Sequence, residues 1–486
     1  MIQTQPCDQS LSAVATSSPG PSALDVLVAF VKERRTSGHV PKDFGAFERD
    51  VHARVMAVER EILAAELASA DEVSSAVEVN GIVYRRVLRS ASTYFTASGP
   101  VNVERSLYKD RTDEASPAIC PMELRLGIIE GRWTPLAAEL AVWVVSQMTP
   151  GLAEELFSRV GNMTPSKSTL DRLPKRLLAA SEDERESFDA AVRKDEIVPA
   201  NAAIVAVSLD GILAPMNNGE SVKKRADAAE NGKLTKGPAG YREVGTGTVS
   251  MYDADGELLR VVRMARMPEA KKTTLKAMLT EELSVVLAAR PDLQLVKVAD
   301  GAKDNWKFLS QSLPRGVEVL DFYHAAEHLS AAYGAAYGDG TVEARRQFEL
   351  KRHILRHEMD GVETVIRSLV YLAKKHPRKT RISEVLKYFR SNRARMQYAA
   401  VASQNLPIGS GVVEAACKTL VAQRIKLSGM RWGDDGAQAI LNFRGWQQSD
   451  RFDRAWALIA ARYKAEVTTI ANVINLQDHS RAKRQQ

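Results

Sequence analysis

The sequence is poor in cysteine and has no long apolar run, and both features exclude whole classes of protein. Among its 486 residues, Cys7, Cys120 and Cys417 lie far apart without a Cys-x-x-Cys spacing, so neither a disulfide framework nor a cysteine zinc site is predicted. No segment reaches the roughly 20 apolar residues of a membrane-spanning helix, and the N-terminus lacks the basic and apolar regions of a secretion signal. We therefore expect a cytoplasmic protein of about two to four domains.

Acidic residues are outnumbered, and the excess of positive charge is concentrated in one window. The formal net charge of the chain is +7. Between Arg345 and Arg395 there are 15 lysines and arginines against 5 aspartates and glutamates, a surplus of 10. Such a surplus suits a polyanionic partner, because each neutralised phosphate releases condensed counterions. A solvated helical face is the alternative.

The first quarter of the chain is expected to hold a leader and a small mixed region. Residues 1–23 are mostly small and polar, which is typical of a disordered leader. Residues 24–115 are predicted to form helices followed by a short β-hairpin. Its strands, near 82–84 and 101–103, are joined through Ser98-Gly99-Pro100.

Residues 116–198 have the outline of a helix-turn-helix DNA-binding region. A helix over 152–160 is followed by a turn at Gly161 and by a further helix that Thr164-Pro165-Ser166 opens. The residues of this helix that we expect to contact DNA are Lys167, Ser168 and Arg172. Pro174 is expected to disturb its later part. Two packed helices without a nucleic-acid role are the alternative.

Residues 199–329 alternate apolar strands with helices. The predicted order is strands over 203–209, 245–252 and 258–264, a helix over 268–289, a strand over 295–299, a helix over 303–313 and a strand over 317–320. A basic helical insertion (330–405), a segment with a further helix (406–450) and a C-terminal helix with a basic tail (451–486) follow. Helices between the later strands require parallel pairing. We therefore predict a multidomain α/β protein, with an RNase H-like mixed sheet and a helical insertion.

Asp210 and Asp300 occupy equivalent places, because each is the first polar residue after an apolar strand and each precedes a glycine. Side chains there project from the carboxyl edge of the sheet, where α/β proteins bind their ligands. Two carboxylates so close raise each other's pKa unless a cation lies between them, and Mg²⁺ prefers such oxygen ligands. The pair predicts a magnesium site, whereas either Asp-Gly alone would also suit a simple turn.

A third acidic ligand is predicted at Glu414, within the segment Gly409–Lys418. This position falls in the first turn of a helix, where a glutamate also interacts well with the helix dipole. The neighbours Val412 and Val413 are apolar, so much of the turn is expected to be buried. A buried glutamate without a partner would be costly, and metal coordination would remove that cost.

Four segments together resemble the bacterial insertion-sequence transposases of the ISKra type, which belong to the Mutator-like group. These segments are Ser208–Gly211, Ala299–Trp306, Asp321–His328 and Gly409–Lys418. The resemblance implies an RNase H-like core with an Asp-Asp-Glu triad at Asp210, Asp300 and Glu414. It implies that the triad binds two Mg²⁺ ions, for which Mn²⁺ substitutes, and that His324 lies near the scissile phosphate.

The same resemblance implies the reaction and the partners. The reaction is cleavage and strand transfer at phosphodiester bonds, without a covalent enzyme intermediate. The partner is double-stranded DNA, both transposon ends and target, bound by a homodimer or a larger assembly. The expected phosphate contacts are Lys223, Lys224 and Arg225 in the loop after the first strand, and Arg424, Lys426 and Arg431 after Glu414. A solvated surface is the alternative for both groups.

A different class of protein is suggested by His324-Ala325-Ala326-Glu327-His328, which matches the inverted zinc-peptidase motif. That motif requires all three ligating and catalytic residues within one helix. Because His324 follows the strand ending at Leu320 so closely, we expect it at the strand–helix junction instead. A peptidase would also leave Asp210, Asp300 and the basic insertion unused. A catalytically silent DNA-binding protein and a cellular nuclease of the same fold are further alternatives.

Overall fold

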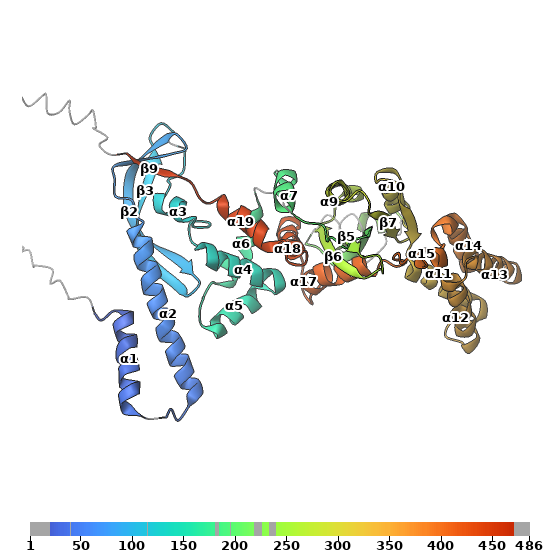
Figure 1. The fold of residues 1–486 in the computed structure, drawn as a ribbon, viewed down its shortest axis with the longest axis horizontal. Helices are drawn as coiled ribbons and strands as arrows, with labels where there is room; N and C mark the ends of the chain where they lie inside the picture. Colours follow the sequence, from blue (N-terminus) through green and yellow to red (C-terminus); the bar gives the residue numbers. More distant parts are fainter. Residues whose placement is uncertain are drawn as a thin grey trace, which may run out of the picture. The chain divides into compact units, whose positions relative to one another are not determined.

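The chain divides into two compact units, each built from segments that are separate in the sequence (Figure 1). A computed structural model describes residues 20–38, 40–113, 115–179, 184–194, 196–217, 226–232 and 240–470. The first unit comprises Met1–Ala137, Leu156–Pro165 and Tyr463–Gln486, and the second comprises Ala138–Glu155 and Ser166–Arg462. Within the described ranges, no helix is both long enough and apolar enough to cross a lipid bilayer. Most of the expected leader and the expected basic tail fall outside these ranges.

The first unit contains two long helices and a four-stranded antiparallel sheet. Its elements are α1 (Ala23–Ser37), α2 (Phe44–Ser69), β1 (Ala76–Val79), β2 (Ile82–Thr96), β3 (Gly99–Asp110), α3 (Pro121–Leu126) and β9 (Val467–Ile470). The strand order is β3-β2-β1-β9. The end of α2 packs on the sheet, where Leu67 joins a cluster with Tyr94, Val101 and Val103.

Two expectations for this unit are corrected by the structure. The sequence predicts short strands near 82–84 and 101–103, but β2 and β3 have 15 and 12 residues. The middle of β2 is exposed, so it lacks the apolar alternation by which a half-buried strand is recognised. In the C-terminal region, the sequence predicts a tail after the helix, but Val467–Ile470 form β9, which pairs with β1.

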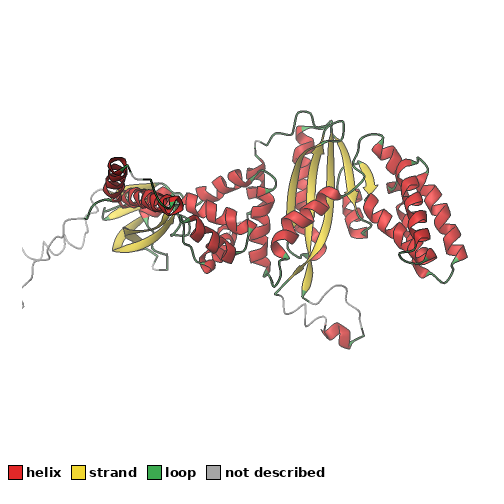
Figure 2. Cartoon of the chain, turned by 90° about the horizontal axis from the view of Figure 1, so that it is seen from below, coloured by secondary structure: helices red, strands yellow, loops and turns green. Residues whose placement is uncertain are grey.

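A five-stranded mixed sheet forms the centre of the second unit, and Figure 2 shows helices packed beside it. Its strands are β4 (Ile204–Pro215), β5 (Tyr241–Tyr252), β6 (Leu258–Arg266), β7 (Gln294–Ala299) and β8 (Val317–Leu320), in the order β6-β5-β4-β7-β8. β5 is antiparallel to β4 and β6, whereas β4, β7 and β8 are parallel. The helices that follow β6, β7 and β8 are α9 (Thr273–Ala289), preceded by η1 (Ala270–Lys272), then α10 (Lys303–Gln311) and α11 (Phe322–Tyr337). The predicted mixed α/β class is therefore confirmed.

β4 is longer than predicted, and it has two neighbouring strands along its first part but only one along its second. Its pairing with β7 ends at Ser208 and Val298, whereas its pairing with β5 continues to Pro215. The sequence predicts that the strand ends before Asp210. In the structure Asp210 instead lies within β4. It lies where β4 has lost its parallel neighbour and keeps the antiparallel one. The apolar run stops at Leu209 because the next residues are partly exposed.

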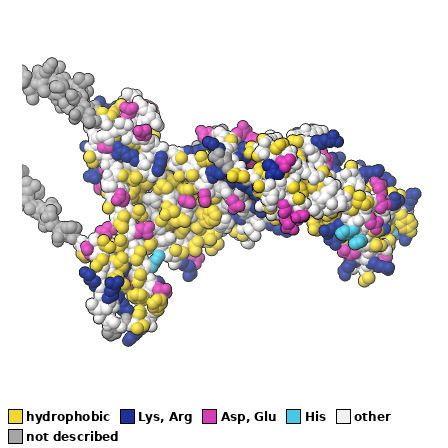
Figure 3. Space-filling model, in the orientation of Figure 1, with side chains coloured by type: hydrophobic (Ala, Val, Ile, Leu, Met, Phe, Trp, Pro, Cys, Tyr) yellow, Lys and Arg dark blue, Asp and Glu magenta, His cyan; other side chains and the backbone are white. Residues whose placement is uncertain are grey.

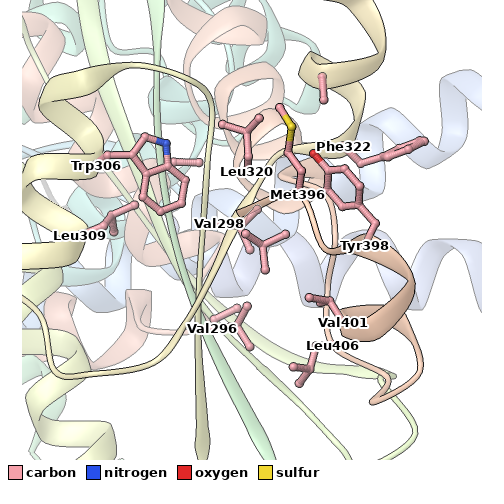
Figure 4. Packing of buried hydrophobic residues seen from close by; sticks show 14 of the residues in the cluster. Val296, Val298, Trp306, Leu309, Leu320, Phe322, Met396, Tyr398, Val401 and Leu406 are labelled. Atoms are coloured by element: carbon pink, nitrogen blue, oxygen red, sulfur yellow. The ribbon is translucent and has the colours of Figure 1, made fainter. Parts of the chain in front are cut away.

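A helical insertion follows β8. Besides α11 it contains α12 (Val342–His357), α13 (Gly361–Lys375), α14 (Thr380–Asn392), η2 (Arg393–Arg395) and α15 (Tyr398–Ala402). Figure 4 shows Val298 of β7 lying toward Met396 and Tyr398, which come from the end of the insertion. The sheet and the insertion thus share one hydrophobic core, which fixes the point where the chain returns to the sheet.

The remaining helices come from the segment before β4 and from the segment after the insertion. They are α4 (Pro135–Gln147), α5 (Pro150–Val160), α6 (Lys167–Ala179), α7 (Arg185–Arg193), α16 (Gly411–Ala416), the π-helical η3 (Cys417–Ala422), α17 (Gln423–Ile425), α18 (Asp434–Gln447) and α19 (Phe452–Ala461). Contrary to the prediction, α6 continues through Pro174. Pro174 is buried on the same face as Leu170, Leu173 and Leu177, and the burial of this face offsets the hydrogen bond that the proline lacks.

Candidate functional site

Asp210 and Asp300 lie beside each other at the edge of the sheet. Ser208 of β4 and Val298 of β7 are the last paired residues of two parallel strands. Each aspartate lies two residues further along the chain, so we expect both side chains to project on the same side of the sheet. They interact electrostatically and line one pocket of about 260 Å³. The structure thus brings these two predicted residues together.

A third aspartate continues the row. Ala299 of β7 pairs with Leu320 of β8, so the next residues, Asp300 and Asp321, are neighbours in the same register. The N–H of Asp321 donates to the carbonyl oxygen of Ala299 at 2.8 Å. The carboxyl edge of three parallel strands therefore collects three carboxylates, and this is the edge where α/β sheets bind ligands.

The neighbours of Asp210 act on its charge in opposite directions. Burial raises the pKa of Asp210, and the like charge of Asp300 raises it further. The N–H of Gly211, which donates to Oδ1 at 2.7 Å, lowers that pKa, and so do the charges of Lys272 and His324. The net shift is upward, as expected for a partly buried carboxylate that faces a like charge.

Asp300 is held in place by the first turns of α10. Its Oδ1 accepts hydrogen bonds from the N–H of Ala302 and from the side-chain amide of Asn305, both at 3.1 Å. Its carbonyl oxygen accepts the indole N–H of Trp306 at 2.6 Å. Ala302 and Asn305 also line the pocket. These contacts orient the Asp300 carboxylate relative to the sheet edge.

Lys272 places a positive charge beside Asp210, although the sequence gives no signal for it. The Lys272 side chain is only 16% exposed, and its Nζ lies 2.7 Å from Oε1 of Glu243. The same Nζ donates to the carbonyl oxygen of Asp210 at 3.3 Å. Both Lys271 and Lys272 have a φ of 55°, a left-handed conformation that is uncommon for residues with a Cβ. Such strain persists only where the surroundings hold it.

Glu414 lies in the first turn of α16, which packs across β4 and β5. The hydroxyl of Ser410 donates to its Oε1 at 3.1 Å. Three residues later, the thiol of Cys417 donates to Oδ2 of Asp210 at 3.8 Å. Because residues three apart share one helix face, this contact turns the face of Glu414 toward Asp210. The π-helical η3 begins at Cys417, and such segments are frequent at functional sites.

Glu414 also belongs to a group that could hold a metal ion. The ligand atoms of Asp321, His324 and Glu414 all lie within 4.8 Å of one another. Among the described residues, this is the group of histidine, cysteine and acidic side chains that meets this distance. His324 also interacts electrostatically with Asp210. A donor set of carboxylates and one imidazole does not select a single divalent cation.

The residues of the zinc-peptidase motif lie in one helix, as that motif requires, but its two histidines have different neighbours. α11 begins at Phe322, so His324 lies inside the first helical turn rather than at the junction that the sequence predicts. Its Nδ1 lies 3.5 Å from Oε2 of Glu327. The ring of His328 stacks on Tyr388, with 4.0 Å between ring centroids, and burial lowers the pKa of His328. His328 is not part of the metal-binding group.

The residues expected to contact DNA divide into exposed, buried and undescribed positions. On α6, Lys167, Ser168 and Arg172 are exposed, opposite the buried leucines. Lys426 and Arg431 are exposed after α17. There the N–H of Trp432 donates to the carbonyl oxygen of Pro215, at the end of β4. The loop residues Lys223, Lys224 and Arg225 lie outside the described residues.

Arg424 corrects one of these expectations. Its side chain is buried, and its Nε and Nη2 donate to the carbonyl oxygen of Val145 at 3.2 and 3.1 Å. The guanidinium also lies over the ring of Trp432, 5.0 Å from the centroid. An arginine so enclosed holds protein segments together, and a DNA phosphate does not reach it. The sequence alone does not show that this side of the helix is covered by the segment that contains Val145.

The basic insertion presents its charge at the surface. Figure 3 shows Lys and Arg side chains gathered over the insertion helices on the face in view. The end of α13, the start of α14 and the turn between them carry five exposed basic residues, Lys374, Lys375, Arg378, Lys379 and Arg381. The surplus that the sequence shows is therefore available to an anionic partner.

No protein-family model matches this chain, and no curated protein matches it as a relative.

Proposed function

We propose that this protein is a DNA transposase of the Asp-Asp-Glu type, similar to the ISKra group, with Asp210, Asp300 and Glu414 as its catalytic carboxylates. One observation carries the proposal. The register of β4 and β7 sets the two aspartates side by side, and the helix of Glu414 reaches Asp210 through Cys417. Three acidic residues from distant segments thus face one edge of a sheet.

The order of the strands supports an RNase H-like core. β6, β5 and β4 form an antiparallel set, and β7 and β8 extend it in parallel on the other side of β4. The helix with the third acidic residue follows a long helical insertion, as in the Mutator-like group that the sequence resembles. Each acidic residue of the proposed triad comes from a different segment of this arrangement.

The acidic residues fit a pair of divalent cations. Burial and the charge of Asp300 raise the pKa of Asp210, and a cation between the two carboxylates would reverse that effect. Carboxylate oxygens are the ligands that Mg²⁺ prefers, and Mn²⁺ accepts them too. Bound there, the ions would supply Lewis-acid chemistry for the displacement at a phosphodiester.

The chain's own groups define the rest of the proposed reaction. Lys272 provides a fixed positive charge next to Asp210 for a phosphate oxygen. His324 lies close to Glu414 and acts on Asp210, so it is placed to contact the phosphate or to move a proton. Burial raises the pKa of Cys417 to about 12, so its thiol stays protonated and is not a nucleophile. Water and a DNA 3′-hydroxyl are the proposed nucleophiles.

DNA recognition is assigned to surfaces outside this edge. We assign end recognition to the exposed face of α6 with Lys167, Ser168 and Arg172, in the manner of a recognition helix. Lys426 and Arg431 lie near the end of β4, and phosphate contacts there would position the DNA. A homodimer or a larger assembly would hold two transposon ends together.

Two other functions remain as outcomes of the test. A zinc peptidase would need His328 as a ligand, and the stacking of His328 on Tyr388 argues against it. A catalytically silent DNA-binding protein would have no use for three carboxylates at one sheet edge. Zinc that survives dialysis of the pure protein would favour the peptidase.

The test is a strand-cleavage and strand-transfer assay with the terminal repeats of the element that encodes the protein. Asp210→Ala, Asp300→Ala and Glu414→Ala should each lower product formation more than about 100-fold, because each removes a metal ligand. Product should form with Mg²⁺ or Mn²⁺ and not in the presence of a chelator. Native protein that binds the repeats without cutting them would instead indicate the silent DNA-binding protein.

Asp292→Asn is the matched control. It also removes one carboxylate, but Asp292 is exposed, lies before the start of β7 and is paired with Arg290 at 2.7 Å. Its activity should match that of the native protein. Equal losses in the control and in the triad variants would mean that the assay reports general charge rather than a site at the carboxyl edge.

A further inference from the structure

Asp321 joins two chain segments that are 89 residues apart. Its side chain is completely buried, and both of its oxygens accept backbone hydrogen bonds. Oδ1 accepts the N–H of His324 at 2.7 Å, which caps α11. Oδ2 accepts the N–H of Ser410, which precedes α16. One carboxylate therefore binds both the start of α11, where the chain leaves the sheet, and the residue before α16, where it comes back.

Backbone contacts around Asp321 close the base of the insertion. The N–H of Phe322 donates to the carbonyl oxygen of Ile408 at 3.0 Å. At Gly409, a Cβ would lie 2.9 Å from Cε2 of Tyr323 and 3.6 Å from Oδ2 of Asp321. A side chain at position 409 would therefore have to displace the ring of Tyr323.

The contact continues from Ser410 to Glu414. The carbonyl oxygen of Ser410 accepts the N–H of Glu414 at 3.0 Å, and the hydroxyl of Ser410 donates to Oε1 of Glu414 at 3.1 Å. A displacement of Ser410 would therefore move both the first turn of α16 and the Glu414 carboxylate. Asp321 acts on Glu414 through this one residue.

We infer that Asp321 is a positioning residue, whose carboxylate fixes Ser410 and thereby places Glu414 as a ligand of the divalent cation. The inference rests on the proposed function for the ligand role of Glu414. Both oxygens of the buried Asp321 carboxylate already accept backbone N–H groups, from His324 and from Ser410. The Asp321 oxygens are thus engaged by the backbone. The other two members of the metal-binding group are His324 and Glu414.

Asp321→Asn should break the contact with Ser410 and keep the cap of α11. Asparagine caps helices as well as aspartate does, so α11 keeps its cap. The other side-chain atom becomes an NH₂ group, which faces the N–H of Ser410 and cannot accept from it. The affinity for Mn²⁺ alone, measured by electron paramagnetic resonance of the free ion, should fall threefold or more, on the order of 10-fold.

Ser410→Pro breaks the same contact from the other side. Proline removes the N–H that Oδ2 accepts, and the Asp321 carboxylate stays intact. Proline also removes the hydroxyl that donates to Glu414, so Ser410→Ala, which removes that hydroxyl alone, gives the baseline. If Asp321 acts through Ser410, Ser410→Pro should weaken Mn²⁺ binding beyond Ser410→Ala. If Asp321 were itself a metal ligand, the two variants would bind Mn²⁺ with equal affinity, which would overturn the inference.

Thr341→Ala is the matched control for the loss of a hydrogen bond. Thr341 caps α12 of the same insertion, where its hydroxyl accepts the N–H of Ala344 at 3.2 Å. This variant should lose some thermal stability but keep native Mn²⁺ affinity. A parallel loss of affinity in Thr341→Ala would show that the insertion acts on the site only through general stability, against the inference.

Glu414→Gln separates the failure of this inference from the failure of the proposed function. If Glu414→Gln loses Mn²⁺ binding and Asp321→Asn loses less than threefold, the positioning role is wrong and the metal site stands. If Glu414→Gln binds Mn²⁺ as the native protein does, Glu414 is not a ligand, and the proposed function fails at its metal site.

Discussion

Asp210 is a half-buried carboxylate with a second carboxylate beside it, and both conditions favour its neutral form. The pKa of Asp210 is raised in the folded protein, first by burial and then by the charge of Asp300. In the unfolded chain these two effects are absent. Folding therefore favours the protonated carboxyl. The stability that this group contributes is present at acid pH and is lost as the pH rises through the raised pKa.

Asp210→Asn should therefore make the metal-free protein more stable at neutral pH. The amide keeps the shape of the side chain and removes the buried charge. Thermal melts in a chelator should give a higher midpoint for the variant at pH 7, and the difference should disappear at pH values below the ordinary aspartate pKa. Added Mn²⁺ should stabilise the native protein and not the variant. A native protein that is the more stable of the two in chelator would contradict the assigned environment of Asp210.

The acidic residues could be predicted from the sequence because their positions follow from local pattern. Asp210 and Asp300 each end an apolar run, and Glu414 opens a helix after glycines. Arg424 could not be predicted in this way, since its burial depends on the carbonyl oxygen of Val145, 279 residues earlier in the chain. The role of Asp321 depends in the same manner on Ser410. Long-range hydrogen-bond partners leave no local signal.

Arg451 is the centre of a buried ionic cluster that connects three elements of the second unit. It precedes α19, and its side chain is 8% exposed. Its guanidinium forms paired hydrogen bonds with Glu282 of α9, at 2.6 and 3.0 Å, and with Glu196 before β4, at 2.6 Å each. Glu282 is itself only 2% exposed, and Arg451 is its nearest cationic partner.

Arg451→Met should lower the free energy of unfolding by about 3–5 kcal/mol, because it leaves Glu282 charged and buried without its main partner. Denaturant unfolding at neutral pH measures this change. Arg367→Met is the control, since Arg367 and Asp360 are both about two-thirds exposed, and their pair should contribute less than about 1 kcal/mol. A similarly small loss of unfolding free energy in both variants would mean that the ionic cluster does not stabilise the fold more than an exposed ion pair does.

Element order was predictable to a greater degree than element length. The succession of strands and helices from β4 to α11 matches the predicted order, because alternation between apolar runs and helical spacing is a local property. The length of β4 was not predictable, because its second half is held by β5 alone. β9 has four residues with no buried face, and only its pairing with β1 makes it a strand.

At the scale of the whole molecule, the basic insertion is the largest concentration of one sign of charge. If it binds DNA phosphates, replacement of Lys374, Lys375 and Lys379 by alanine should flatten the dependence of log K on log salt. The slope should fall by about 0.9 for each phosphate that the variant no longer neutralises. Fluorescence anisotropy with one duplex at several salt concentrations gives this slope.

The control for that experiment removes the same charge elsewhere. Alanine at Lys32, Arg35 and Lys42, all exposed in the first unit, lowers the net charge equally. Its salt slope should stay closer to the native value than that of the insertion variant. Equal slopes for the two variants would show that overall charge, and not the insertion, sets the affinity.

The pairing of β9 with β1 has a consequence for the order of events during synthesis. β1 leaves the ribosome early, but its partner is made only after the whole second unit, roughly 20 to 80 seconds later at 5–20 residues per second. During that interval β1 presents an open edge, which invites pairing with other chains. The unit that begins first is thus completed last, and a polypeptide released before Val467 would keep that edge unpaired.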